Sequence, residues 1–121
     1  MKTTALLLTT MLLPMVAEAR DNWTSEDTAR EAVYLILHTI DWGQTRHISN
    51  NCDRFREGNV FLGDCPSLKE VDQYFALTGL AHVGISYVLP REWRKAWQYI
   101  TIGIETGAVG HNYKAGVSID F

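Results

Sequence analysis

The first clear pattern in the chain is an apolar stripe at helical spacing. Its members recur every three or four residues, which predicts an amphipathic helix over 25–42. Thr24 or Ser25 can cap the first backbone N–H groups of this helix. Gly43 is its expected end, because glycine is common just after a last helical turn. The stripe consists of Ala29, Ala32, Val33, Ile36, Leu37 and Ile40.

Two further helices are expected in the second half of the chain. Ser67 followed by Glu70 is the pattern of a capping box. The run that follows is almost wholly apolar or small and reaches Pro90, which predicts a helix over 67–89. The next segment begins with charged residues and then becomes apolar, which predicts a third helix over 91–110.

The remaining segments lack helical periodicity. Residues 43–66 are rich in turn residues and charges and predict a long loop, and 111–121 is expected to form a C-terminal tail. The predicted fold class is therefore all-α. It is either a small helical bundle or a membrane helical hairpin, with an amphipathic first helix and a long loop.

The end of the chain also carries an alternating pattern, with glycines between its two halves. Such alternation is typical of a β-hairpin, which is a competing interpretation of this region. A short terminal strand or an extended tail would reconcile it with an all-α fold. The alternating residues are Ile100, Ile102, Ile104, Val117, Ile119 and Phe121.

The N-terminus has the three-part pattern of a secretory signal peptide. A positive residue precedes a mostly apolar run over 5–16, and Ala17 and Ala19 stand at the −3 and −1 positions of a cleavage site. We therefore expect 1–19 to be a signal peptide and 20–121 to form a single helical domain. An uncleaved membrane anchor is disfavoured because the apolar run is too short for about 30 Å of hydrocarbon.

Composition narrows the classes of function. The chain has 121 residues, which is room for one domain. Its 46% hydrophobic and 21% charged residues exclude a disordered chain. The 11 Lys and Arg residues against 14 Asp and Glu residues leave a net charge of −3. We expect no nucleic-acid partner, because there is no basic excess to neutralise phosphates.

Export would give the two cysteines a structural meaning. Cys52 and Cys65 lie 13 positions apart, and such a pair in an oxidising compartment predicts a loop-closing disulfide. Free buried thiols are the alternative. A zinc site is disfavoured because the spacing matches no known ligand pattern and no histidine stands at ligand spacing beside either cysteine.

Aromatic and basic residues favour a membrane hairpin made of 67–89 and 91–110. Tyrosine and tryptophan lie near the ends of both segments, as expected at an interface. The connection carries Arg91, Arg94 and Lys95, which is typical of a short cytoplasmic turn and leaves the cysteine loop outside. The apolar parts are shorter than the usual ~20 residues of a span. A soluble periplasmic helical bundle is therefore the alternative.

Polar side chains at helical spacing form stripes on all three predicted helices. Buried histidines and carboxylates commonly satisfy one another, which is the favoured interpretation. A proton relay, a pH switch or a transition-metal site are the alternatives. No catalytic residue, metal or cofactor is assigned, because no specific ligand or nucleophile motif occurs. The candidates for this polar seam are His38, Asp41, His82, Glu105 and His111.

Several short segments together resemble a group of small signal-bearing or membrane proteins of proteobacteria and their phages, a group with no known activity. The group typically has Glu-x-Asn-Pro in its central loop, whereas Val60 follows Asn59 here. The resemblance implies a location in the cell envelope and assigns no functional residue. It rests on Asp41 to Arg46, Glu57 to Asn59, Leu62 to Ser67, Tyr74 and Phe75, His82, and Trp97 to Tyr99.

These patterns together predict an exported, non-enzymatic envelope protein. We expect it to associate with the inner membrane, with a periplasmic loop, and to act as an accessory or interaction protein. Its expected partners are membrane lipid and another envelope protein. The alternative is a soluble periplasmic binding or enzymatic module whose His/Glu seam is centred on His82 and Glu105.

Overall fold

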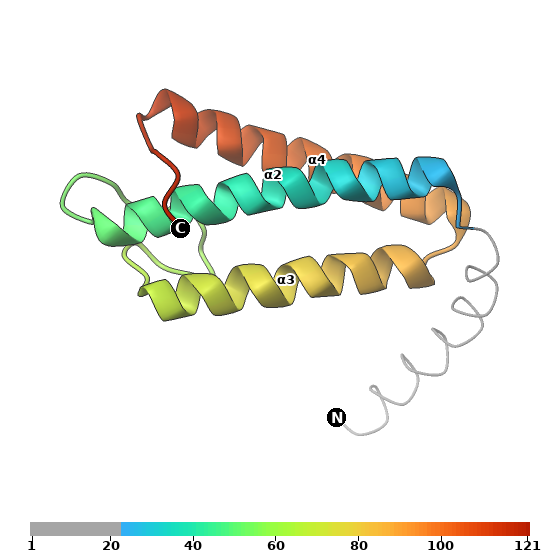
Figure 1. Cartoon of the computed structure of the whole chain (residues 1–121), viewed down its shortest axis with the longest axis horizontal. Helices are drawn as coiled ribbons and strands as arrows, with labels where there is room; N and C mark the ends of the chain where they lie inside the picture. Colours follow the sequence, from blue (N-terminus) through green and yellow to red (C-terminus); the bar gives the residue numbers. More distant parts are fainter. Residues whose placement is uncertain (1–22) are drawn as a thin grey trace, which may run out of the picture.

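A computed structural model describes residues 23–121, which fold into a three-helix bundle (Figure 1). The helices are α2 (Ser25–Asn50), α3 (Leu68–Val88) and α4 (Arg91–Lys114). Successive helices run in opposite directions, so α2 and α4 run parallel to each other. No strand occurs in this part of the chain. The all-α fold class is therefore confirmed, and of its two predicted forms the small helical bundle fits the described residues. The expected signal peptide, 1–19, lies outside the described residues.

Local sequence signals set the helix starts. The Thr24 side chain accepts a hydrogen bond from the backbone N–H of Asp27, whose carboxylate accepts one from the backbone N–H of Thr24. Ser67 and Glu70 form the same reciprocal capping box at the start of α3. Pro90 stands at the N-cap of α4, a position that needs no backbone donor. The predicted starts are correct to within a residue.

The first helix is longer than predicted and passes through Gly43 to Asn50. A Cβ atom at Gly43 would lie 2.4 Å from Ile119 Cγ2 and 2.6 Å from Phe121 Cε2. The backbone N–H of Asp120 also donates to the Gly43 carbonyl at 3.0 Å. Gly43 therefore marks the place where the C-terminal tail crosses the helix, and its interpretation as a helix end was wrong.

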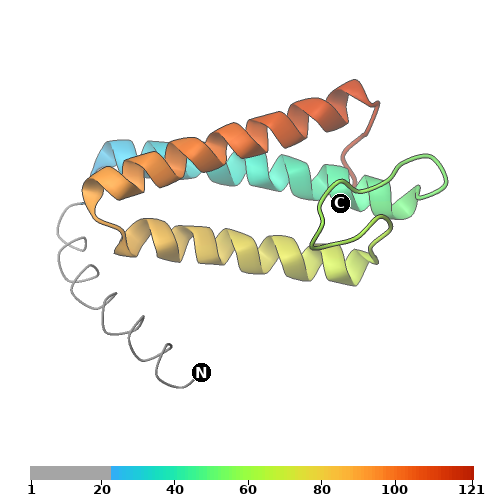
Figure 2. The same ribbon diagram turned by 180° about the vertical axis from the view of Figure 1, so that it is seen from behind.

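This difference shortens the loop and the tail. The connection between α2 and α3 covers 51–67 instead of beginning at residue 43, and α4 continues to Lys114 instead of ending at residue 110. The loop folds over one end of the bundle (Figure 2). The predicted disulfide between Cys52 and Cys65 is confirmed and ties the two ends of this loop together.

The β-hairpin interpretation of the chain end was wrong. Ile100, Ile102 and Ile104 all lie within α4. Val117 to Phe121 form an extended tail without strand pairing in the described residues. The tail packs against α2, where the Phe121 ring meets Trp42 edge-on at a centroid distance of 6.1 Å. Alternation in the tail thus reflects packing on a helix.

Within residues 23–121, none of the helices is both long enough and apolar enough to cross a membrane. The expected hairpin of two spanning helices, 67–89 and 91–110, is therefore not supported. The physical reason is that polar side chains interrupt both segments at nearly every turn, as His82 and Ser86 do in α3 and Gln98 and Glu105 in α4. Such residues lower the mean hydropathy of any long window.

Candidate functional site

The interior of the bundle is polar. Among the described residues, nine polar or charged side chains are buried, against five hydrophobic ones. Burying such groups is unfavourable unless each finds hydrogen-bonding partners. The interior therefore holds the candidate functional groups of the bundle. The buried polar residues are Asp27, Glu31, His38, Gln44, Thr45, His82, Ser86, Arg94 and Gln98.

The buried polar residues follow a regular spacing. Along α2 the inward positions are 27, 31, 34, 38, 41, 45 and 48, which alternate steps of four and three like the seam of a coiled coil. Contacts between α2 and α4 repeat with one offset of 67 residues. They join Asp27 to Arg94, Glu31 to Gln98, and His38 to Glu105. The parallel helices thus meet in register. We call each set of side-chain contacts at one height along the bundle a level.

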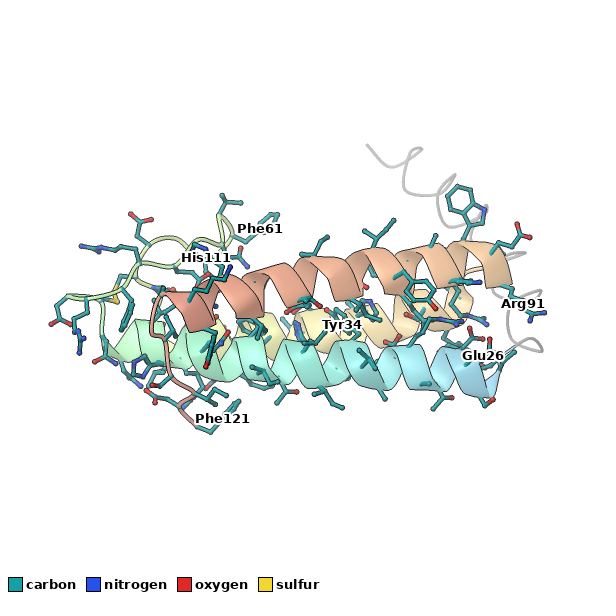
Figure 3. All side chains as sticks on the ribbon, turned by 90° about the horizontal axis from the view of Figure 1, so that it is seen from above. Glu26, Tyr34, Phe61, Arg91, His111 and Phe121 are labelled. Carbon is teal, nitrogen blue, oxygen red and sulfur yellow. A yellow bond between two sulfur atoms is a disulfide. The ribbon has the colours of Figure 1, made fainter. Side chains whose placement is uncertain are left out.

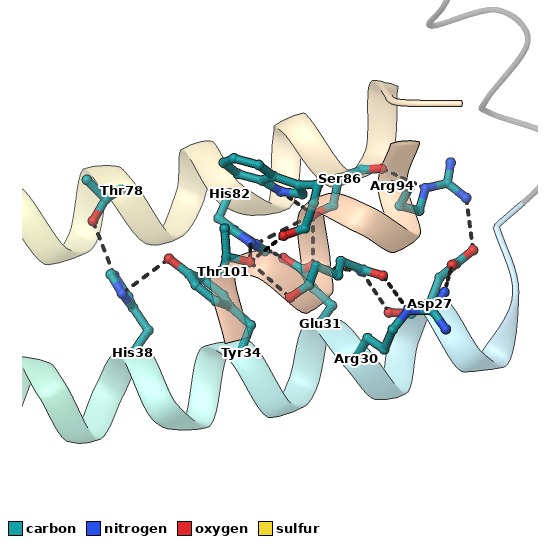
Figure 4. Close-up of polar contacts among 12 residues, drawn as sticks. Asp27, Arg30, Glu31, Tyr34, His38, Thr78, His82, Ser86, Arg94 and Thr101 are labelled. Atoms are coloured by element: carbon teal, nitrogen blue, oxygen red, sulfur yellow. Dashed lines mark hydrogen bonds and ion pairs between the residues drawn. The ribbon is translucent and has the colours of Figure 1, made fainter. Parts of the chain in front are cut away.

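The first level is an ion pair at the beginning of α2 (Figure 4). Arg94 donates from Nη1 to Asp27 Oδ2 at 2.9 Å, and both side chains are almost completely buried. Arg30 also pairs with Asp27. Burial alone would raise the pKa of Asp27, but hydrogen bonds from the Thr24 backbone and from Arg94 hold it below its ordinary value. Asp27 is therefore ionised and anchors α4 to α2.

The second level is built around His82 and Glu31. His82 Nδ1 lies 2.7 Å from Glu31 Oε1, and Ser86 Oγ and Gln98 Nε2 each donate to Glu31 Oε2 at 2.9 Å. Burial raises the pKa of Glu31, yet these three partners outweigh it and hold the pKa below its usual range. Thr101 Oγ1 lies 2.7 Å from the other ring nitrogen of His82.

Aromatic stacking connects the second level to the third. The Tyr34 ring stacks on His82 at a centroid distance of 3.4 Å and on His38 at 5.2 Å (Figure 4). Its hydroxyl lies 3.3 Å from His38 Nδ1. Burial, together with the negative charge of Glu105, raises the pKa of Tyr34. Tyr34 therefore stays neutral between the two histidines.

The third level joins His38 to Glu105. His38 Nδ1 lies 3.2 Å from Glu105 Oε1, and Nε2 lies 2.9 Å from the carbonyl oxygen of Phe75. Both ring nitrogens thus face acceptors, which favours the doubly protonated imidazolium. Burial lowers the pKa of His38, but Glu105 and the Phe75 carbonyl outweigh it and raise the pKa above its ordinary value. His82 and Glu105, on which the alternative His/Glu seam was centred, therefore have different partners, Glu31 and His38.

Asp41 lies next to this level and titrates unusually. Burial raises its pKa to about 8, helped by the charge of Glu105, a hydrogen bond with the Glu105 carboxyl group and the charge of Glu57, while His38 opposes the shift. Asn112 Nδ2 lies 3.4 Å from Asp41 Oδ1. Asp41 is thus mostly protonated at neutral pH and able to donate its proton to a neighbouring carboxylate.

The polar interior opens into a cavity of about 630 Å³ at the loop end of the bundle. His111 belongs to the lining but is exposed and stands apart from the buried network (Figure 3). Three of the five sequence candidates, His38, Asp41 and Glu105, therefore come together, whereas His82 occupies the neighbouring level. The lining comprises Asp41, Ile48, Arg54, Phe55, Arg56, Glu57, Gly58, Asn59, Tyr74, Phe75, Ile104, Glu105, Ala108, His111, Asn112, Ala115 and Val117.

Sequence reasoning missed several members of this network, above all Glu31, Arg94 and Glu57. A signal for Glu31 was present, because it stands three residues before Tyr34 on the same helical stripe. Arg94 stands one heptad before Thr101. Glu57 lies in the irregular loop, so no periodicity could have placed it at the cavity.

In the part of the chain that the structure describes, no group of three or more His, Cys, Asp and Glu residues is arranged to hold a metal ion. Comparison of the chain with protein-family models, with curated proteins and with solved structures found no match. The resemblance to small envelope proteins of proteobacteria and their phages therefore stays a prediction.

Proposed function

We propose that this chain is an exported, non-enzymatic envelope protein that contacts membrane lipid and serves as an accessory or interaction partner of another envelope protein. The observation that carries the proposal is the inverted distribution of side chains. Charged groups such as Asp27, Glu31 and Arg94 are buried, while large apolar residues such as Leu80 and Ile100 are more than 60% exposed. Polar groups in a lipid environment face the bundle interior in the same way.

Each helix has a window with no exposed charged side chain. The three windows are 29–40 in α2, 76–87 in α3 and 96–107 in α4. Their exposed residues are Ala29, Ala32, Val33, Ile36 and Thr39; Ala76, Leu77, Leu80, Ala81, Val83, Gly84, Ile85 and Tyr87; and Ala96, Tyr99, Ile100, Gly103, Ile104, Thr106 and Gly107. We call these three windows together the apolar belt.

The windows overlap in height on the bundle. The offset of 67 residues between α2 and α4 places 29–40 beside 96–107. The contact of His82 with Glu31 and that of His38 with the Phe75 carbonyl place 76–84 beside 29–37. Nine helical residues cover about 13 Å, so the three windows share an apolar band of about that height.

The two exposed threonine hydroxyls in the belt are satisfied by the helices themselves. Thr39 Oγ1 donates to the Leu35 carbonyl and Thr106 Oγ1 to the Ile102 carbonyl, each at 2.7 Å. These exposed hydroxyls therefore need no hydrogen bond from solvent, which suits contact with acyl chains.

The belt faces outward on all three helices, which favours lipid over a single docking protein. A protein docked on one side would leave the apolar surface of the other sides in water, and large exposed apolar patches are unusual in water-soluble monomers. Charged residues flank the belt, among them Glu26 and Arg91 at one end and Lys69 and Lys114 at the other. The proposal requires contact with acyl chains and does not require any helix to cross the bilayer.

The disulfide supports the proposed compartment. Disulfides form and persist in oxidising environments such as the periplasm and are rare in the cytosol. The Cys52–Cys65 bridge is therefore in keeping with an exported chain whose 51–67 loop faces the periplasm.

Membrane fractionation of the full chain tests this proposal. We expect the protein to sediment with membranes and to remain there after carbonate washing. A triple variant, Ile36→Gln, Leu80→Gln and Ile100→Gln, changes exposed belt residues on all three helices. We expect it to keep its helical content and to shift into the soluble fraction.

A matched control lies outside the belt. Val60 is 87% exposed in the loop, so Val60→Gln removes a similar apolar surface elsewhere. This variant is expected to stay with membranes. Recovery of the unaltered protein in the soluble fraction, as a monomer or as an oligomer, would contradict the contact with lipid and favour a soluble periplasmic module.

A further inference from the structure

The cavity at the loop end joins an acidic floor to apolar walls. Glu105 reaches it from α4, Asp41 from α2 and Glu57 from the loop. Phe75 and Ile104 provide apolar wall surface. A volume of about 630 Å³ is in the range of small-molecule sites, which typically combine apolar walls with a few convergent polar groups.

Two carboxylate oxygens in this cavity have no permanently protonated donor beside them. Glu57 Oε2 and Glu105 Oε2 are both buried without such a partner, a condition that only Arg46 Nε shares among the described side chains, and the proton available to Glu105 is the one that Asp41 retains at neutral pH. The other oxygen of each carboxylate has a hydrogen-bonding partner. Glu105 Oε1 faces His38 Nδ1, and Glu57 Oε1 accepts a hydrogen bond from the backbone N–H of Asn59. A buried carboxylate oxygen without a donor is unfavourable, and both oxygens belong to residues of one cavity.

The uncompensated buried charge of the cavity is that of Glu57 and favours a cationic occupant there, because the His38 imidazolium faces Glu105 and Asp41 keeps its proton at neutral pH. The arginines of its lining, Arg54 and Arg56, are exposed, so solvent screens their charge. The Arg54 guanidinium also lies over the Phe55 ring, 5.7 Å from its centroid. The two carboxylate oxygens, by contrast, are buried, where a charge-assisted hydrogen bond is strong.

We propose that this cavity binds a small organic cation, a primary amine on an apolar or aromatic body, whose ammonium group donates to Glu105 and Glu57 while its body packs against Phe75 and Ile104. An ammonium group has three donors, which is enough to serve both orphaned oxygens. An aromatic body suits walls that include Phe55 and Tyr74. Ile104 belongs to the apolar belt as well as to the cavity wall, whereas Phe55, Tyr74 and Phe75 lie outside the belt.

Benzylamine is the probe for the test, with benzyl alcohol as the neutral compound of the same shape. In a ¹H–¹⁵N NMR titration of the purified full chain, we expect benzylamine to give saturable shifts at residues of the cavity. Benzyl alcohol is expected to bind about tenfold more weakly, because it lacks the charge-assisted hydrogen bonds.

Three variants locate the site. Glu57→Gln and Glu105→Gln are each expected to weaken benzylamine binding about fivefold to tenfold, with little effect on benzyl alcohol. Ala108→Phe narrows the cavity without changing its charge and is expected to weaken both compounds. Glu26→Gln removes an exposed carboxylate at the opposite end of the bundle and is the matched control, expected to bind like the original protein.

The variants also keep the result interpretable if one of them unfolds. Glu105→Gln removes a partner of buried His38, whereas Glu57 lies in the loop, so Glu57→Gln preserves the helix contacts. Equal affinity for benzylamine and benzyl alcohol would overturn the proposal. Absence of saturable shifts at the cavity, or unchanged binding in a folded Glu57→Gln variant, would overturn it as well.

Discussion

At the scale of single residues, the bundle holds carboxyl groups whose pKa values shift in opposite directions. Hydrogen bonds keep the pKa of Glu31 low despite its burial. Burial and the neighbouring charge of Glu105 raise the pKa of Asp41 to about 8. The number of hydrogen-bond donors around each carboxyl group, more than its burial, decides whether its pKa is lowered or raised.

The raised pKa of Asp41 should make part of the stability fall with increasing pH. The unfolded chain releases the Asp41 proton near its ordinary pKa of 3.8, whereas the folded chain keeps it until about 8. Between these values the unfolded state binds fewer protons, so the contribution of Asp41 to stability decreases as pH rises. Asp41→Asn should therefore gain about 4 kcal/mol relative to the original protein between pH 5 and pH 8.

Chemical denaturation at several pH values measures this difference. Groups facing Asp41 are Glu105 on α4, Glu57 in the loop and His38 on its own helix, and they remain unchanged in the variant. Asp53→Asn, an exposed substitution in the loop, is the control. Parallel stability curves for Asp41→Asn and the original protein would show that Asp41 ionises normally.

Glu31 should show the opposite dependence on pH. Its pKa is lowered in the folded state, so its stabilisation is present above its ordinary value of 4.5 and is lost as pH falls through the folded pKa. Glu31→Gln should cost about 2 kcal/mol at pH 7, because His82 loses its charged partner. The deficit should shrink toward pH 3, and thermal melting across this range would measure it. Glu26→Gln, exposed one turn earlier, should change stability little.

At the scale of the elements, capping boxes and hydrophobic spacing predicted where the helices begin, but not how far they run. The capping residues act within one turn, so their effect is visible in the sequence. The continuation of α2 through Gly43 depends on a tail that lies 76 residues farther along at Ile119. No rule based on neighbouring residues distinguishes a glycine that ends a helix from a glycine inside a helix that lets another segment of the chain pack closely against it.

If Gly43 makes room for the C-terminal tail, the effect of Gly43→Ala on stability should change sign when the tail side chains that contact Gly43 are removed. Gly43→Ala should destabilise the protein by about 1 kcal/mol, because the new methyl group displaces the tail. In a background with Ile119→Ala and Phe121→Ala, the obstructing side chains are gone. There the same substitution should stabilise by up to about 1 kcal/mol, since alanine is the better helix former. Urea unfolding measures both, and equal effects in the two backgrounds would contradict the packing role.

At the scale of the whole molecule, the bundle is turned inside out relative to most small water-soluble proteins. Its helices are held together by ion pairs and hydrogen bonds at successive levels, and its apolar residues form an outward belt. The 51–67 loop and the tail enclose the end where the cavity lies (Figure 2). Internal polar contacts therefore specify the helix register, and the outward belt is the surface that we propose to contact lipid.

The disulfide acts on the molecule mainly through the unfolded chain. Closing a loop of 13 residues reduces the freedom of the unfolded ensemble and contributes about 3 kcal/mol. Replacing both cysteines by serine should lower the free energy of unfolding by that amount, measured by denaturant titration. Because the loop forms one wall of the cavity, benzylamine binding should weaken too. A reductant should affect the original protein and leave the double variant unchanged.

The sequence by itself determined the three helices, their caps and the pairing of the only two cysteines, because these depend on neighbouring residues or on composition. It also placed His38, Asp41 and Glu105 on polar stripes, since helical spacing puts them on defined faces. Only the tertiary structure decided that these polar stripes point inward and that His38, not His82, meets Glu105. Helical periodicity defines two faces and leaves open which is buried, and contacts across 51 to 71 residues settle that choice.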